Sequence, residues 1–292
     1  MTETNQTLRQ TAEVFACPDC KARLQDLFCR ACKTQFAESD GIPILLSRRE
    51  EFRTAQHVGE AYDDIYARHS DVWKDQGRTP EFIQYFAGLV KSLNAKSLLE
   101  IGCGEGFLLA AMNASEKSEV DISLEALRKV RQKVNARVSV ALAERLPFED
   151  ESFDLAVSVG VMEHFLDTQA ANEEIRRVLR SGGSYLLLIH VALGLGATLK
   201  LRFSEYIFPN FRPVALARWA WKKITSPVIQ PIQRRFTEET VADSLRRAGF
   251  EIRRVISKRS DSGAPLSGPH VFIFLAARPG GLLAPQEAAA HP

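Results

Sequence analysis

Residues 98–106 read LLEIGCGEG, and residues 107–112 continue as FLLAAM. A short apolar run around one acid leads into three glycines at alternate positions, and the second run has the composition of a helix. This order predicts a buried strand, a tight turn and a helix start. Glycine accepts backbone conformations that other residues resist, so a ligand can lie against the bare backbone of the turn. The unpaired N–H groups at a helix start favour an anionic group. The stretch therefore predicts a ligand-binding site.

The acids within and after this stretch narrow the choice of ligand. A dinucleotide-binding loop has the spacing G-x-G-x-x-G, whereas residues 102–106 have G-x-G-x-G. Glu100 and Glu105 would repel a pyrophosphate but suit a ligand with an ammonium group. S-adenosylmethionine is such a ligand, because its carboxylate can meet the N–H groups of the turn while its ammonium lies near Glu100. Asp121, at the end of the next expected strand, is placed to accept hydrogen bonds from the ribose hydroxyls.

Strands and helices are expected to alternate from residue 97 onward. Continuous apolar runs predict strands at 97–101, 118–121, 138–142, 153–159 and 184–191, and helices between them at about 106–113, 123–134 and 168–180. Ser123 is a good N-cap for the second helix, and Gly182 and Gly183 are expected to stop the third. Thr237 is expected to cap a further helix, followed by strands at about 250–257 and 270–277. Apolar strands between helices are typical of a doubly wound parallel α/β sheet.

Residues 97–190 resemble the core of a class I S-adenosylmethionine-dependent methyltransferase, of the type 11 group that includes the ubiquinone and menaquinone biosynthesis enzymes. The segments that carry the resemblance are 99–106, 120–123, 143–148, 149–154, 162–165 and 182–183, with 236–237 and 248–250 near the end. It implies a seven-stranded Rossmann-like sheet with one antiparallel strand near an edge, and in-line displacement of the methyl group from a sulfonium. The cofactor contacts that it implies are Glu100, Gly102, Cys103, Gly104, Gly106, Asp121, Ile122, Ala143, Glu144 and Tyr62. Leu142 stands where the family often has an acid, so Glu144 or the backbone is expected to contact the adenine.

Four cysteines precede this domain. Cys17, Cys20, Cys29 and Cys32 form the pattern C-x2-C-x8-C-x2-C. Two cysteine pairs at this spacing predict tetrahedral thiolate coordination of a structural zinc ion, with no open position for substrate. Disulfides would require an oxidising compartment, which the polar start of the chain argues against. With residues 36–46 the module resembles the zinc-ribbon subunit that activates several tRNA, rRNA and protein methyltransferases. Substrate binding by this ribbon is an alternative to a purely structural role.

The resemblance places substrate above the carboxyl edge of the sheet. His164, Glu163 and His190 are expected near that edge, where a histidine can take a proton from an oxygen, nitrogen or acidic carbon nucleophile. The alternatives are structural hydrogen bonds for His164 and Glu163, and a polar strand end for His190. His69 lies in the helical region that contains Tyr62, where the family often folds a helix over the cofactor; packing of the tyrosine is the alternative there.

The charge of the chain is uneven although its net value is only +2. Residues 200–235 hold eight basic residues and one acidic residue, interleaved with phenylalanines, tyrosine and tryptophans. This basic and aromatic insert suits an anionic lipid surface, through an interfacial helix around 212–224, an RNA backbone with stacked bases, or a small acidic metabolite under an apolar lid. A helical insert that packs on the core is the fourth alternative.

The expected organisation is an α/β methyltransferase sheet with a small zinc ribbon. The segments are a disordered leader 1–12, the ribbon 13–46, a linker 47–60, the methyltransferase domain 61–278 with its substrate-cover insert 192–235, and a disordered tail 279–292. Hydrophobic and charged fractions of 45% and 25% are ordinary for a globular protein, and no apolar run is long enough to span a membrane. A cytoplasmic location, with or without peripheral membrane contact, is expected.

The resulting hypothesis is methyl transfer from S-adenosylmethionine to a small or lipid-linked metabolite. An RNA methyltransferase is the enzymatic alternative, motivated by the ribbon and the basic insert. An adaptor that binds the cofactor without catalysis is the third possibility. The oligomeric state and the acceptor atom do not follow from the sequence.

Overall fold

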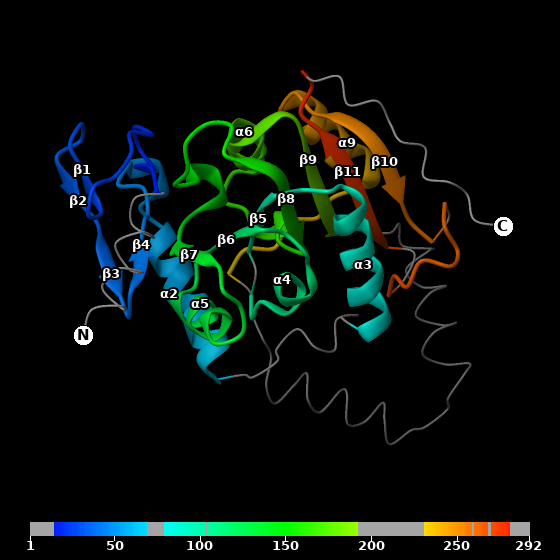
Figure 1. Ribbon diagram of the computed structural model, residues 1–292, viewed down its shortest axis with the longest axis horizontal. Helices are drawn as coiled ribbons and strands as arrows, with labels where there is room; N and C mark the ends of the chain where they lie inside the picture. The colour runs from blue at the N-terminus through cyan, green and yellow to red at the C-terminus, as the bar shows by residue number, and fades with distance from the viewer. Residues whose placement is uncertain are drawn as a thin grey trace.

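Figure 1 shows the computed structural model of the chain, which describes residues 15–68, 79–102, 104–191, 231–258, 260–267 and 270–280. Within these residues, nine strands form one mixed sheet in the order β10-β11-β9-β8-β5-β6-β7-β4-β3. Its strands are β3 (Ala37–Ser39), β4 (Ile42–Ile44), β5 (Ser97–Ile101), β6 (Glu116–Asp121), β7 (Arg137–Val140), β8 (Phe153–Val159), β9 (Leu179–His190), β10 (Glu251–Ile256) and β11 (Val271–Ala277). The strands β9, β8, β5, β6, β7 and β4 run parallel to one another, whereas β11 is antiparallel to both β9 and β10, and β3 is antiparallel to β4.

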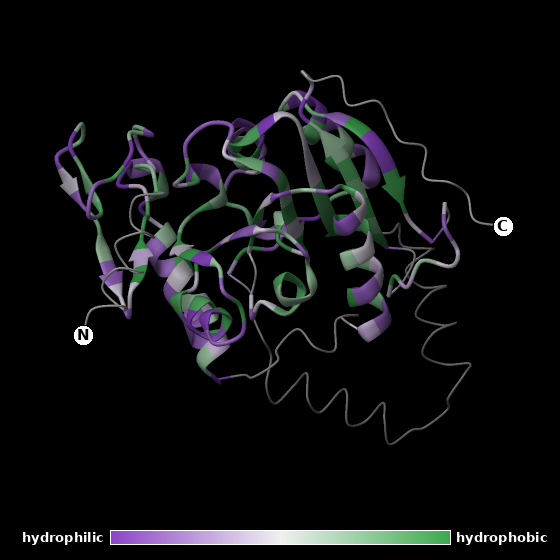
Figure 2. Cartoon of the chain, viewed as in Figure 1, coloured by the Kyte–Doolittle hydropathy of each residue, from purple (hydrophilic) through white to green (hydrophobic). Residues whose placement is uncertain are grey.

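Helices cover both faces of this sheet. They are α2 (Ala55–Arg68), α3 (Pro80–Ser92), α4 (Phe107–Ala111), α5 (Leu124–Arg131), α6 (Thr168–Val178) and α9 (Glu238–Arg247). Successive residues of a strand point to opposite faces. Leu98 accordingly packs with α3 and α4, and Leu99 belongs to the cluster that contains residues of α6 and α9. Figure 2 shows the hydrophobic colouring of the central strands that these helices cover.

The topology brings several chain segments to one edge of the sheet. Parallel strands end on the same side, and a ligand binds outside their carboxyl ends in open α/β sheets. Gly102 follows β5, Asp121 ends β6, Gly160 follows β8 and His190 ends β9. Three short 3-10 helices, η1 (Glu50–Phe52), η2 (Ala143–Arg145) and η3 (Met162–His164), add further side chains; η2 follows β7 and η3 follows β8. This carboxyl edge is where the site is built.

The four-cysteine segment is joined to the large sheet. Its strands β1 (Phe28–Cys29) and β2 (Thr34–Gln35) pair with each other, but β4 pairs in parallel with β7. The N–H of Leu45 donates to the carbonyl of Val140 at 2.8 Å. The ring of Phe15 lies 5.6 Å from that of Phe148, and both belong to one continuous hydrophobic core. The sheet therefore extends beyond the seven expected strands, because the ribbon contributes two.

The predicted fold class is confirmed, as are most predicted elements. Ser123 and Thr237 cap α5 and α9 with their side chains. The expectation for Gly182 and Gly183 was wrong: α6 ends earlier, at Val178, and both glycines lie inside β9. A Cβ on Gly183 would lie 2.9 Å from the carbonyl oxygen of Arg180, so a close backbone approach accounts for this glycine. Helix α2 begins inside the segment expected as a linker.

Four expectations fall on residues outside the described ranges. They concern residues 192–230 of the insert, His69, Cys103 and the two chain ends. Among the described residues, no helix combines the length and the apolar character that crossing a bilayer requires.

Candidate active site

The glycine turn after β5 has the backbone conformation that its sequence predicts. Gly102, Gly104 and Gly106 have φ angles of +67°, +56° and +72°. A Cβ on Gly102 would lie 2.4 Å and 2.6 Å from the two Cγ atoms of Val161, so this position also lacks room for a side chain. The turn is therefore held between strand β5 and the segment that follows β8. Cys103 lies outside the described residues.

Two buried acids flank the turn. Asp121 accepts hydrogen bonds from the N–H of Gly104 at 3.1 Å and from the N–H of Ser123 at 2.9 Å. Burial raises the pKa of this carboxyl to about 6, although these N–H groups lower it. Glu100 is buried on β5, beside Glu119 of the neighbouring strand. The site thus concentrates carboxyl groups next to the glycine turn.

A cavity of about 610 Å³ opens at this edge of the sheet. One end is lined by Gly102, Asp121 and two residues of η2, Ala143 and Glu144, and the other by Glu163 and His164 of η3 with His190 and His270. Its volume lies in the range of small-molecule and cofactor sites, about 300–1,000 Å³. The arrangement joins a glycine turn with a buried acid to a group of titratable side chains in one cavity.

Residues 99–187 match the methyltransferase domain family. Over these residues the chain carries a methyltransferase domain. It is 32% identical over 161 residues to an uncharacterised protein of Methanocaldococcus jannaschii, covering 53% of this chain and 61% of that one. It is 38% identical to a probable S-adenosylmethionine-dependent methyltransferase of Mycobacterium tuberculosis, covering 35% of this chain and 37% of that one. The chain thus spans about three fifths or less of these relatives.

The fold of the methyltransferase domain also occurs in solved structures. A chain from the complex of the Haloferax volcanii Trm112 methyltransferase activator superimposes with a TM-score of 0.52 and 16% identity, covering 77% of this chain and 98% of that one. At this identity the likeness shows the fold alone. The Rossmann-like sheet expected from the sequence is therefore confirmed.

The predicted cofactor contacts of the methyltransferase domain fall into two groups. Those that line the cavity are Gly102, Asp121, Ile122, Ala143, Glu144 and Tyr62. Glu100, Gly104 and Gly106 lie in strand β5 or in the turn, behind this lining. Their roles toward a cofactor stay predictions, as does that of Cys103.

Glu105 forms an ion pair that the sequence did not predict. Its carboxylate is buried and lies 2.7 Å from Nζ of Lys129, which also donates to the carbonyl of Tyr66 at 2.7 Å. A paired carboxylate repels an approaching anion less than an isolated one. Glu105 would therefore repel the pyrophosphate of a dinucleotide less than its sequence suggested. The argument against a dinucleotide then depends on Glu100.

The expected adenine side of the cavity contains Leu142 and η2. Glu144 is buried, and its Oε1 accepts a hydrogen bond from the N–H of Asp167 at 3.0 Å. Burial raises the pKa of Glu144. Leu142 lines the cavity where the family often has an acid and packs with Phe52. The carboxylate of Glu144 thus ties the cavity wall to the start of α6.

The three predicted catalytic residues come together at the other end of the cavity. Nδ1 of His164 lies 2.5 Å from the carbonyl oxygen of Ile232. Nδ1 of His190 lies 3.4 Å from Oε1 of Glu163. The ring of Tyr62 meets that of His164 edge to face, with centroids 6.3 Å apart. The structure brings these groups together, and their catalytic roles stay predictions.

Sequence reasoning missed the part of this end that comes from the last third of the chain. His270, at the start of β11, has its ring 5.9 Å from that of His190. Gln233 and Ser267 also line the cavity. None of these residues lies in a motif, so only the antiparallel pairing of β11 with β9 places His270 here. An expected pairing of residues 184–191 with 270–277 could have indicated it.

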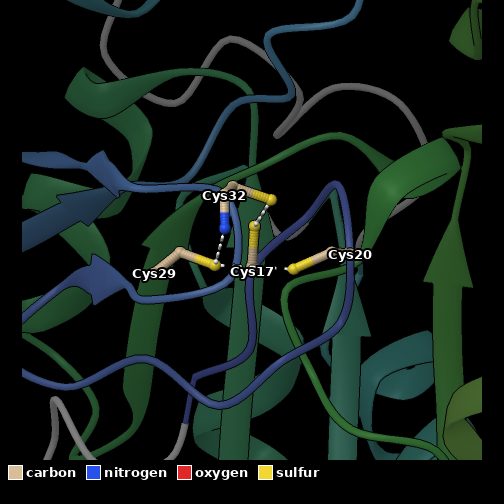
Figure 3. Close-up of side chains that lie close together, drawn as sticks. All are labelled: Cys17, Cys20, Cys29 and Cys32. Atoms are coloured by element: carbon tan, nitrogen blue, oxygen red, sulfur yellow. Dashed lines mark hydrogen bonds between the residues drawn. The ribbon is translucent and has the colours of Figure 1, made fainter.

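The four cysteines converge as their spacing predicts (Figure 3). Their sulfur atoms all lie within 4.8 Å of one another. The Sγ atoms of Cys17 and Cys32 are 3.9 Å apart, and those of Cys20 and Cys29 are 3.4 Å apart. The backbone N–H of Cys32 donates to Sγ of Cys29 at 3.4 Å. Four convergent thiols with such support fit one tetrahedral zinc ion, which leaves no position for a substrate.

Proposed function

We propose that this protein transfers the methyl group of S-adenosylmethionine to a small or lipid-linked metabolite. The observation that carries the proposal is the single cavity that joins the glycine turn and Asp121 to the side chains of His164, Glu163 and His190. An enzyme that transfers a group between two bound molecules needs both in one enclosed space. The methyltransferase domain match over residues 99–187 supports the reaction class.

The residues of the turn end are proposed to hold the cofactor. Asp121 would accept hydrogen bonds from the ribose hydroxyls, because its carboxylate, an acceptor of hydrogen bonds, lines the cavity beside the glycine turn. Gly102 leaves the backbone bare beside the ligand, and Ala143 with Leu142 forms an apolar wall suited to an aromatic base. When bound, S-adenosylmethionine supplies an electrophilic methyl group on a sulfonium.

The residues of the other end are proposed to position the acceptor and to hold its proton. Proximity and orientation are the main contribution, and such positioning is worth about 7–11 kcal/mol in well-ordered systems. Tyr62 of α2 and His164 of η3 close the cavity from one side, and Phe82 of α3 contributes an apolar wall. These apolar and aromatic surfaces support a small or lipid-linked acceptor over an exposed nucleic acid.

Binding and transfer test the proposal separately. Calorimetry with S-adenosylmethionine and with its demethylated product measures the first step, and transfer of a labelled methyl group to a lipid extract, a metabolite extract or total RNA measures the second. We expect Asp121→Asn to weaken cofactor binding at least tenfold, and His164→Ala to lower turnover far more than cofactor affinity. Glu173→Gln, an exposed change on α6, is the control.

Each outcome decides among the three hypotheses. Transfer to the metabolite or lipid extract supports the proposal, and transfer to RNA alone replaces it with an RNA methyltransferase. Tight cofactor binding without transfer to any extract favours an adaptor. Absence of cofactor binding refutes the proposal as a whole.

A further inference from the structure

The lining of the cavity has an unusual set of titratable groups. The residues that line the cavity include three carboxylic acids, Asp121, Glu144 and Glu163, and three histidines, but among the described residues no lysine or arginine. Glu163 itself is only 7% exposed. Among the described residues, no lysine or arginine of the cavity lining would balance a carboxylate or phosphate of the acceptor beside this buried carboxyl group, and such a placement is costly in a partly desolvated site.

The guanidinium of Arg234 lies close to η3 but does not supply a positive charge to the cavity lining. Its Nε donates to the carbonyl of Phe165 at 3.2 Å, and its Nη2 donates to the carbonyl of Leu166 at 2.5 Å. The side chain is thus engaged by the backbone behind the lining, and Arg234 is not among the residues that line the cavity. An anionic acceptor therefore meets no opposite charge from this residue.

Two side-chain atoms at this end, Nε2 of His164 and Oε2 of Glu163, are hydrogen-bond acceptors. A carbonyl oxygen can only accept, so the 2.5 Å contact with Ile232 assigns the hydrogen of the neutral His164 ring to Nδ1. Nε2 of His164 then carries a lone pair. Oε2 of Glu163 is buried and has no hydrogen-bond partner among the described residues, and the same holds for Oη of Tyr62. A ligand group that donates a hydrogen bond matches Nε2 and Oε2.

The remaining surface of this end is apolar. Phe82, Val159, Leu188 and Val271 line the cavity next to the titratable groups. The site thus places these two acceptors, beside side chains that can also donate, inside hydrophobic walls, which is the usual composition of a pocket for an apolar molecule with few polar groups.

We infer that the acceptor is an uncharged, apolar molecule that enters with a hydroxyl group, and that Nε2 of His164 receives the hydroxyl proton. The inference rests on the proposed function and narrows its substrate class. The hydroxyl oxygen forms the new C–O bond with a lone pair, its proton passes to Nε2, and the electron pair of the broken S–C bond stays on sulfur. The products are a methyl ether, the demethylated cofactor and an imidazolium.

A hydroxyl group fits this site better than an amine does. The carboxylate of Glu163 would stabilise an amine as its ammonium ion, which has no lone pair with which to attack the methyl group. A hydroxyl stays neutral beside the same carboxylate and needs a base only as the new bond forms, which is the role of a positioned histidine.

Binding of matched probes tests the charge selectivity. The full-length protein is saturated with S-adenosylhomocysteine, and calorimetry compares 2-naphthol with 2-naphthoate and 2-naphthyl phosphate, and 1-decanol with decanoate. We expect each alcohol to bind at least tenfold more tightly than its anionic partner. Equal or tighter binding of the anions, or no binding of either alcohol, overturns the inference. If S-adenosylhomocysteine itself does not bind, the proposed function has failed instead.

Two variants test the assigned groups. Glu163→Gln removes the carboxylate charge with little change of shape, so the preference for alcohols over anions should fall at least threefold; the matched control Glu173→Gln should leave it unchanged. His164→Gln should keep S-adenosylhomocysteine affinity within twofold but remove the acidic limb of the pH–rate profile. An unchanged preference in Glu163→Gln, or an unchanged limb in His164→Gln, refutes the corresponding assignment.

Discussion

Replacement of Gly102 by alanine should destabilise the protein by about 2–5 kcal/mol. The backbone φ of +67° is left-handed, which costs a residue with a Cβ about 1–2 kcal/mol. The added methyl would also lie 2.4 Å and 2.6 Å from the Cγ atoms of Val161, and overpacking of this kind costs about 1–3 kcal/mol. The two costs have separate origins, so they can be separated by experiment.

Val161→Ala removes both overlapping methyl groups and leaves the backbone cost in place. In a double-mutant cycle we therefore expect a favourable coupling of about 1–3 kcal/mol between Gly102→Ala and Val161→Ala, measured by equilibrium urea unfolding. Gly88→Ala is the matched control: it lies in helix α3 with nothing within 4 Å of the added Cβ, and should stabilise by about 0.5–1 kcal/mol. A coupling within about 0.5 kcal/mol of zero would refute the steric part of this reasoning. Unaltered stability of Gly102→Ala would refute all of it.

Three further perturbations address the site, the ion pair and the ribbon. Because burial raises the pKa of Asp121 to about 6, the folded chain binds more protons than the unfolded chain between about pH 4 and pH 6, so this group should cost about 3 kcal/mol of stability as the pH rises through that window. Urea unfolding of the wild type and of Asp121→Asn at pH 4 and pH 7 measures this cost: between the two pH values the wild type should change unfavourably by about 3 kcal/mol relative to the variant. Lys129→Gln should lower the free energy of unfolding by about 1–3 kcal/mol, because the buried carboxylate of Glu105 loses the ammonium group of Lys129. The double variant with Glu105→Gln should recover part of this stability. Strictly additive effects of the two substitutions would contradict the pairing. Chelation should release one zinc ion per chain and lower the denaturation temperature, and Cys29→Ser should mimic it; a metal-free chain of unchanged stability would contradict the predicted site.

The sequence was sufficient for elements whose signal is local. The apolar run at 97–101, the glycine turn and the capping residues Ser123 and Thr237 each specify one short stretch of backbone, and the structure has them there. The cysteine spacing likewise predicted convergence of the four thiols, because each pair occupies a tight turn of its own. Such features depend on residues that are near in sequence, so they can be predicted without knowing the rest of the fold.

Features that depend on distant pairing were not predicted. His270 reaches the cavity only because β11 pairs antiparallel with β9, with Val271 opposite His190. Gly182 and Gly183 were assigned to the end of a helix, whereas the register between β8 and β9 shifts there and residues 180–183 lie between two paired positions. The partner of Glu105 lies in α5, a contact that no spacing of residues 100–106 indicates.

The pairing of β4 with β7 has a consequence for solubility. Without the ribbon, β7 would end the sheet and present a row of unpaired N–H and C=O groups, which is a template for association with other chains. The ribbon replaces that border with β3, a strand of three residues with an acidic residue, Glu38, at its centre. Short, charged borders are a common protection against aggregation. A version of this protein that begins after the ribbon should therefore lose more than a metal site: it should tend to self-associate.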